Sequence, residues 1–273
     1  MPDADRPRPA EAGHLQVAGQ SLEYRHWGPP PADAPTLVLL HEGLGCVSLW
    51  RDFPERLAAA TGWGVFAYSR AGYGGSSPCD LPRPLTYMHE EAQAVLPALL
   101  DAIGLRRGVL LGHSDGASIA AIYAGARPDP RVRGLVLMAP HFFTEESGLA
   151  AIAEAREAYA AGDLRDRLAR HHGGNVDCAF RGWNDAWLGS GFRAWDITEY
   201  LPAIALPVLV LQGEDDQYGT LAQVETARDR IAGPVTAEVL ADCRHSPQRD
   251  RPEASLLAIG SFLESLNLSK APA

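Results

Sequence analysis

The stretch "RGVLLGHSDGASIAAIYAGA" (residues 107–126) decides the fold of this chain. Its first part, residues 107–113, is a short apolar run and predicts a β-strand buried on both faces. Its second part, residues 114–126, consists mostly of small residues that are compatible with a helix. Ser114 stands at the turn between the two parts. A serine on a sharp strand-to-helix turn is exposed above the sheet with free helical N–H groups beneath it, so this stretch predicts a nucleophile.

The same alternation of strand and helix continues on both sides of this stretch. Residues 86–105 and 252–267 have the apolar spacing of helices, and residues 14–28 alternate around a Gly-Gln-Ser turn as a hairpin does. Buried strands alternating with helices predict an α/β fold with a mostly parallel central sheet and helices on both faces. Further apolar runs that predict buried strands lie at 36–41, 64–69, 132–140, 206–213 and 236–243.

Residues 144–205 break this alternation. They contain no strand-like apolar run, they have helical segments, and they are rich in aromatic residues that include Trp183, Trp187 and Trp195. We therefore expect a helical cap (lid) inserted before the strand that carries the catalytic acid. The alternative is a plain helical subdomain whose aromatic residues form its own core. The predicted parts are a disordered tail at 1–13, an α/β core at 14–143 and 206–273, and the cap at 144–205.

Composition and charge exclude several classes of partner. The chain has 273 residues, 46% of them hydrophobic, and a net charge of −10. An acidic surface is a poor match for nucleic acids and anionic membranes. No run of 18 apolar residues exists, and the first residues lack the apolar core of a signal peptide. We expect a soluble, cytoplasmic protein that acts on a small molecule; the sequence carries no sign of its oligomeric state.

The four cysteines are Cys46, Cys79, Cys178 and Cys243, and no two of them form a CxxC pair. We expect free buried thiols, not a disulfide framework or a zinc site. We accordingly expect no metal site and no cofactor.

A nucleophilic serine needs a base, and the base needs an orienting acid. His245 lies in the loop between the last predicted strand and the closing helix, at the same carboxyl edge of the sheet as Ser114. Asp216 is the third residue after Gly213, which ends another predicted strand. We predict Ser114, Asp216 and His245 as nucleophile, acid and base, with Asp215 as the alternative acid.

The oxyanion of an acyl-transfer reaction needs two N–H donors. The glycine-rich turn "HEGLG" (41–45) follows the strand at 36–41 and lies at the same edge. The backbone N–H groups of Gly43 and Asp115 are therefore the predicted oxyanion hole.

Together these pieces resemble the α/β-hydrolase fold superfamily over nearly the whole chain. "HEGLG", "SRAGYGGSS", "GHSDG", "GEDD" and "RHSPQRDRPE" stand in the family's order and at its spacings. The resemblance implies a cofactor-independent serine hydrolase that cleaves small carboxylic esters through an acyl-enzyme, with a lid where residues 144–205 lie. The elbow Ser-Asp-Gly is similar to that of valacyclovir hydrolase, the biphenyl-hydrolase-like protein, in which the Asp is associated with the substrate's amino group.

The chain departs from the family pattern at several positions. The usual His-Gly turn is His41-Glu42-Gly43, and Ser69 and Ala71 replace the usual Asp and Arg. A Ser nucleophile argues against epoxide hydrolases and haloalkane dehalogenases. Ser246 stands where carbon–carbon hydrolases often have Trp. Amide, thioester and carbon–carbon hydrolysis remain alternatives, as does a non-catalytic ligand receptor on the same fold.

Two carboxylates, Glu42 and Asp115, flank the predicted oxyanion hole. Each has a structural interpretation: Asp115 complements the helix dipole, and Glu42 fixes the turn by a hydrogen bond. Each also has a functional one, in which they bind the amine of an aminoacyl ester or amide. With Trp183 and Trp187 as an apolar wall, they are the predicted substrate-binding residues.

Overall fold

The computed structural model describes residues 11–268 and contains one eight-stranded sheet in the order β1-β2-β4-β3-β5-β6-β7-β8. Strands β1 and β2 pair antiparallel with each other, and β2 pairs antiparallel with β4. All remaining neighbours in the sheet, from β4–β3 to β7–β8, pair parallel. The predicted mostly parallel sheet is therefore confirmed. The strands are β1 (Glu11–Val17), β2 (Gln20–Trp27), β3 (Thr36–Leu40), β4 (Gly64–Tyr68), β5 (Gly108–His113), β6 (Val132–Met138), β7 (Val208–Gly213) and β8 (Val235–Leu240).

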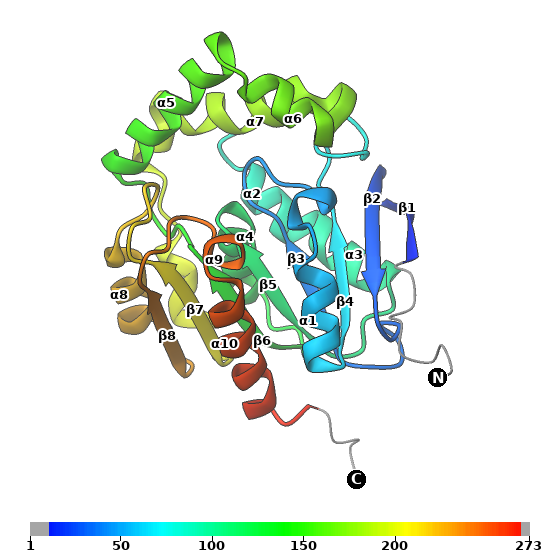
Figure 1. Cartoon of the computed structure of the whole chain (residues 1–273). Coiled ribbons are helices and arrows are strands. Elements are labelled where there is room, and N and C mark those ends of the chain that lie inside the picture. The colour runs from blue at the N-terminus through cyan, green and yellow to red at the C-terminus, as the bar shows by residue number, and fades with distance from the viewer. Residues whose placement is uncertain (1–10, 269–273) are drawn as a thin grey trace.

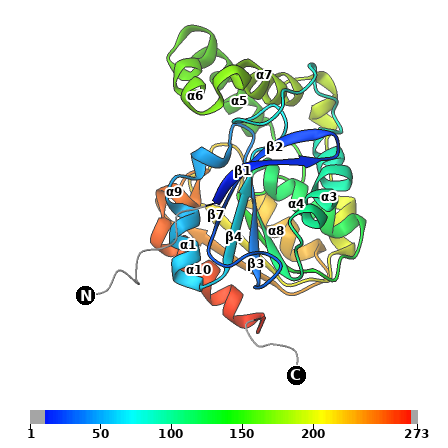
Figure 2. The same ribbon diagram turned by 90° about the vertical axis from the view of Figure 1, so that its right-hand side faces the viewer.

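Helices cover both faces of the sheet (Figures 1 and 2), because the central strands alternate apolar side chains between two cores. Leu37 and Leu39 of β3 pack on the α1 and α10 side, whereas Val38 and Leu40 pack on the α3 and α4 side. The helices are α1 (Phe53–Thr61), α2 (Tyr87–Glu90), α3 (Leu96–Ala102), α4 (Asp115–Ala126), α5 (Glu146–Ala161), α6 (Leu164–His172), α7 (Val176–Trp187), α8 (Leu221–Arg230), α9 (Pro247–Asp250) and α10 (Pro252–Ser265).

Two local expectations need correction. The predicted tail at 1–13 is too long, because Glu11 already pairs with His26 in the antiparallel β1–β2 ladder; residues 1–10 lie outside the described part of the chain. The predicted helix at 86–105 is divided, since a π-helical turn (Glu91–Val95) separates α2 from α3. No helix within residues 11–268 is long and apolar enough to cross a lipid bilayer.

Residues 144–205 lie between β6 and β7 and are mostly helical. We call them the inserted segment. Its helices α5, α6 and α7 lie beyond the carboxyl ends of the strands, at the top of Figure 1. Two 3₁₀ turns (Ser190–Ala194 and Thr198–Ala203) return the chain to β7. The inserted segment thus stands above the edge at which the predicted site residues lie.

The expectation of four free thiols is wrong for two of them. Cys79, in the loop after β4, forms a disulfide with Cys178 of α7, and their Cα atoms are 6.6 Å apart. That distance suits a disulfide, but the sequence separation of 99 between the two cysteines gives no local motif from which to predict it. Cys46 and Cys243 are free and buried.

Candidate active site

Ser114 occupies the turn between β5 and α4 in an unusual backbone conformation, with φ 54° and ψ −119°. The turn holds it there, because the N–H of Ser114 donates to the carbonyl of Met138 at 2.9 Å and its carbonyl accepts from the N–H of Ala117 at 2.8 Å. A side chain at Gly116 would collide with the carbonyl of Leu40 on the neighbouring strand. Such strain is typical of a serine that a strand-to-helix elbow holds out above a sheet.

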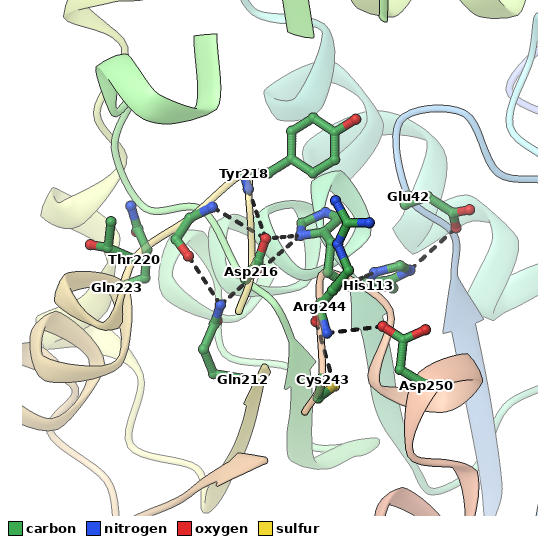
Figure 3. A network of polar contacts seen from close by, with 12 residues as sticks. Glu42, His113, Gln212, Asp216, Tyr218, Thr220, Gln223, Cys243, Arg244 and Asp250 are labelled. Carbon is green, nitrogen blue, oxygen red and sulfur yellow. Dashed lines mark hydrogen bonds and ion pairs between the residues drawn. The ribbon is translucent and has the colours of Figure 1, made fainter. Parts of the chain in front are cut away.

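Asp216 and His245 meet at the carboxyl edge of the sheet. Nδ1 of His245 lies 2.9 Å and 2.8 Å from the two carboxylate oxygens of Asp216. The Gln212 amide donates to that carboxylate at 2.7 Å and the Tyr218 N–H at 2.8 Å (Figure 3). The N–H of Gly219 lies 3.4 Å from the same carboxylate. The bond to Asp216 fixes the imidazole with Nε2 free to face another partner.

The surroundings of Asp216 keep it ionised. Burial alone would raise the pKa of this carboxyl, but the charge and hydrogen bond of His245 and the Tyr218 N–H outweigh burial and lower the pKa to about 2. The side chain of Asp216 is 1% exposed. Asp215, the alternative acid, is instead an exposed residue.

Ser114 and His245 line one cavity of about 180 Å³ beneath the inserted segment. Within the described residues the hydroxyl of Ser114 makes no hydrogen bond to His245. Such bonds are commonly long or misaligned without substrate and tighten when it binds. The cavity is lined by Glu42, Gly43, Leu44, His113, Ser114, His141, Ile152, Trp183, Trp187, Gln217, Tyr218, His245 and Ser246.

Of the two predicted oxyanion donors, Gly43 lines this cavity, and Asp115 directly follows Ser114 in the chain. Neither the N–H of Gly43 nor that of Asp115 has a hydrogen-bond acceptor among residues 11–268. The turn that carries Gly43 is fixed by the buried guanidinium of Arg70, which donates to the carbonyls of His41 and Glu42. Two free, fixed N–H groups beside Ser114 are what an oxyanion requires.

The two flanking carboxylates are both engaged within the protein. The carboxylate of Asp115 does not line the cavity; it is fully buried, and the hydroxyl of Tyr87 donates to it at 2.5 Å. Burial raises the pKa of Asp115. Glu42 does line the cavity, but its carboxylate lies 3.4 Å from Nδ1 of His113.

The two predicted aromatic wall residues both line the cavity. Trp183 packs on the oxyanion turn so closely that a side chain at Gly43 would collide with its indole ring. Trp187 lies edge-on to His141, with 5.3 Å between ring centroids. Trp195 stacks on Phe192 instead and is absent from the lining.

Several residues of the site were not predicted from the sequence. His141 and Tyr218 both pack on His245, with ring centroids 5.6 Å and 4.7 Å away. His141 follows β6 at the carboxyl edge, which is a signal that the sequence does contain. The pKa of His141 is lowered to about 3 because the ring is buried and His245 adds a like charge. Arg70 carries no such signal, since only the fold brings it beneath the turn.

Other features of the described residues lie apart from this site. Residues 11–268 hold no group of three His, Cys, Asp or Glu side chains arranged to bind a metal ion. A larger hollow of about 560 Å³ lies near Pro128, Arg133 and Pro207, and none of the predicted site residues lines it.

Comparisons with known proteins agree with this fold. The model of the Alpha/beta hydrolase family matches residues 37–258. The bifunctional esterase/perhydrolase of Acinetobacter calcoaceticus is 26% identical over 73% of this chain and 80% of its own. An enol-lactonase from Burkholderia xenovorans LB400 has a TM-score of 0.72 at 22% identity, covering 92% of this chain and all (100%) of that one. Carboxylesterase CesB from Bacillus subtilis has a TM-score of 0.71 at 24% identity, covering 94% and 92%. At these identities the two structures are similar in fold alone.

Proposed function

Because the chain belongs to the alpha/beta hydrolase family, we propose that it is a serine hydrolase that cleaves small, neutral carboxylic esters through an acyl-enzyme. Ester cleavage is favoured because a relative named as an esterase matches 73% of the chain. In this proposal residues 14–143 and 206–273 form the catalytic core. Residues 144–205 act as a cap that supplies one wall of the cavity.

In the proposed reaction Ser114 attacks the ester carbonyl while Nε2 of His245 takes the hydroxyl proton. The tetrahedral oxyanion accepts hydrogen bonds from the N–H groups of Gly43 and Asp115. Collapse expels the alcohol, which receives the proton from His245, and water repeats the sequence on the acyl-enzyme. Asp216 keeps the imidazole in the tautomer with the proton on Nδ1 and stabilises its cation.

One observation carries the proposal: the His245–Asp216 pair faces the cavity that contains Ser114 on its strained turn. A buried carboxylate bonded to a histidine also occurs in purely structural networks. Here, however, the histidine lies at a cavity, beside a serine and two N–H groups without acceptors.

A neutral substrate fits this cavity better than an amine. Glu42 already faces His113, and the carboxylate of Asp115 is turned away from the cavity toward Tyr87. The remaining wall is largely apolar, with Ile152, Trp183 and Trp187. We therefore place aminoacyl esters below neutral esters as substrates, although both would use the same reaction.

The test is covalent labelling combined with turnover. A fluorophosphonate probe should label the wild-type protein at Ser114 and leave Ser114→Ala unlabelled. The same variant should lose at least ~10³-fold in kcat on p-nitrophenyl acetate, since the nucleophile is gone. Ser118→Ala, which removes a buried hydroxyl one helical turn away, is the matched control and should keep labelling. Labelling of Ser114→Ala at another serine would refute the proposed nucleophile.

Substrate choice is tested with a panel of short esters that includes a phenylalanine ester and its des-amino analogue. We expect a higher kcat/KM for the des-amino ester. A preference for the amine-bearing ester that Glu42→Gln abolishes would instead support the aminoacyl alternative. Tight ligand retention without turnover, despite labelling, would favour a receptor.

A further inference from the structure

A buried contact joins the predicted oxyanion turn to the nucleophile turn. Glu42 precedes Gly43, and His113, the last residue of β5, precedes Ser114. Oε2 of Glu42 lies 3.4 Å from Nδ1 of His113; the side chains are 28% and 1% exposed (Figure 3). Among the described residues His113 is the one side chain that forms an ion pair or hydrogen bond with the Glu42 carboxylate.

The other ring nitrogen of His113 reaches the loop that carries the proposed base. Nε2 of His113 lies 2.7 Å from the backbone carbonyl oxygen of His245. A carbonyl oxygen only accepts hydrogen bonds, so Nε2 carries a proton and donates it. The ring centroids of His113 and His245 are 5.2 Å apart. His113 therefore contacts both the oxyanion turn and the His245 loop.

Two side chains, Glu42 and Gln248, lie beside Nδ1 of His113 and bear on whether it also carries a proton. The amide nitrogen of Gln248 lies 3.2 Å from Nδ1 of His113, while the amide oxygen of Gln248 is buried without a partner. The orientation of an amide is assigned from its hydrogen bonds. Turning this amide over would let its oxygen accept from Nδ1 but would leave the amide nitrogen unpaired instead, so the amide does not decide the state of Nδ1. The carboxylate oxygen of Glu42 beside Nδ1 only accepts hydrogen bonds, so this contact places a proton on Nδ1. His113 is then an imidazolium that faces the carboxylate of Glu42.

The electrostatics of both groups agree with this state. Burial lowers the pKa of His113, but Glu42 raises it more, so that the net shift is upward. Burial raises the pKa of Glu42, but the bond to His113 outweighs burial and brings the pKa to about 2. The other titratable groups that act on His113 are Asp216, His141 and His245, from the loops after β7, β6 and β8.

We propose that Glu42 and His113 form an ion pair that positions the oxyanion turn and the His245 loop around Ser114. The inference rests on the function proposed above. Glu42 and His113 are positioning residues, because they act through Gly43, Ser114 and His245 and take no part in the bond changes. The pair is also neutral as a whole, so that His245 becomes a cation in the reaction without an unpaired charge beside it.

Removing one partner at a time should move the pH dependence in a defined direction. His113→Gln leaves the Glu42 carboxylate without its cation, and this negative charge favours protonated His245. The acid limb of kcat/KM should therefore move up by about 0.5–1 pH unit. kcat should fall while KM stays within about twofold, because the change affects positioning and not substrate binding.

Two further variants test the origin of that shift. In the double variant Glu42→Gln/His113→Gln the acid limb should return close to its wild-type position, since no unpaired charge remains. Glu154→Gln removes an exposed carboxylate from α5 and is the matched control; it should leave the limb in place. An unchanged limb in a folded His113→Gln, or a limb that the double variant leaves shifted, would overturn the proposal.

The protonation state of His113 is measurable directly, even where His113→Gln fails to fold. In ¹⁵N-histidine-labelled protein both ring nitrogens of His113 should be protonated at pH 7. In Glu42→Gln the ring should lose one proton at that pH. A neutral His113 in the wild type, or an unchanged ring in Glu42→Gln, would refute the ion pair. Failure of the function itself would appear separately, as absent phosphonate labelling of Ser114.

Discussion

At the scale of single residues, Asp216 and Asp215 differ by one position and by their whole environment. The carboxylate of Asp216 accepts hydrogen bonds from four groups and is buried, whereas Asp215 is exposed to solvent. Asp215 contacts the His245 loop through its backbone, because its N–H donates to the carbonyl of Cys243 at 2.9 Å. The third position after Gly213 therefore has the contacts that an orienting acid needs.

Asp216→Asn should lower kcat by about 10³–10⁴-fold, because an amide at this position leaves the imidazole in the wrong tautomer, as in serine proteases. Asp215→Asn removes the same charge from the adjacent residue and should change kcat by less than about threefold. Steady-state kinetics on a p-nitrophenyl ester would measure both. The opposite ranking would show that the acid is Asp215.

Single residues of the site could be predicted from the sequence where they belong to a motif that follows a predicted strand. Ser114, Asp216 and His245 each follow a predicted strand, and the structure brings all three to one edge. The sequence did not predict Arg70, whose contact with the carbonyls of His41 and Glu42 depends on the packing of β3 beside β4. Nor did it predict the pairing of Glu42 with His113, which joins two strand ends far apart in the chain.

At the scale of elements, the inserted segment is attached to the core by contacts at several places. His172, which ends α6, is buried: Nε2 donates to the carbonyl of Leu44 and Nδ1 accepts from the N–H of Gly74, both at 3.0 Å. Trp183 of α7 packs on Gly43. The disulfide between Cys79 and Cys178 adds a covalent link from α7 to the loop after β4.

Because this disulfide spans 99 residues, its removal should destabilise the protein. A disulfide typically stabilises a fold by roughly 2–4 kcal/mol, mainly through the unfolded chain. The double variant Cys79→Ser/Cys178→Ser should therefore melt roughly 4–12 °C below the wild type. Dithiothreitol should lower the wild-type Tm in the same way and leave that of the double variant unchanged. If dithiothreitol lowered the Tm of both proteins equally, its effect would not come from the reduction of this disulfide.

Element prediction failed where apolar periodicity is weak. Helix α8 has the polar sequence LAQVETARDR and buries only Gln223, Val224 and Ala227. Helix α1 is short and buries Phe53, Pro54 and Leu57. Helix α1 packs on α10, and α8 packs on β7 and β8 at the edge of the sheet. Packing against such tertiary surfaces stabilises both helices, and the pattern of a single sequence does not contain that information. The buried strands were predictable because they are continuous apolar runs.

At the scale of the whole molecule, several buried histidines lie at the carboxyl edge of the sheet. His41 and His141 are buried there, and His172 reaches the same turn from the inserted segment. Burial lowers the pKa of all three, to about 3 for His141 and well below the usual value for His41. These three imidazoles are therefore neutral in the folded protein near pH 7, and each takes up a proton at higher pH once the chain unfolds.

Stability should fall as the pH drops below about 6.5, the ordinary pKa of histidine. From there down to the folded pKa, the unfolded chain binds one more proton per histidine than the folded protein. Each histidine then costs up to about 1.4 kcal/mol of unfolding free energy per pH unit. His113, with its raised pKa, is protonated in both states at pH 5, and Asp216 and Glu42 contribute only near and below pH 4.

His141→Gln removes one of these imidazoles and should flatten the pH dependence of stability. Urea unfolding at pH 7 and pH 5 would give the difference in unfolding free energy, which should shrink in the variant by about 1–2 kcal/mol relative to the wild type. His14→Gln, at an exposed position of β1, is the control and should leave the difference unchanged. Equal stability of the wild type at the two pH values would mean that these histidines are protonated without unfolding. In that case the histidines at the edge of the sheet around Ser114 must be hydrated well enough to carry a proton in the folded protein, although their side chains are packed.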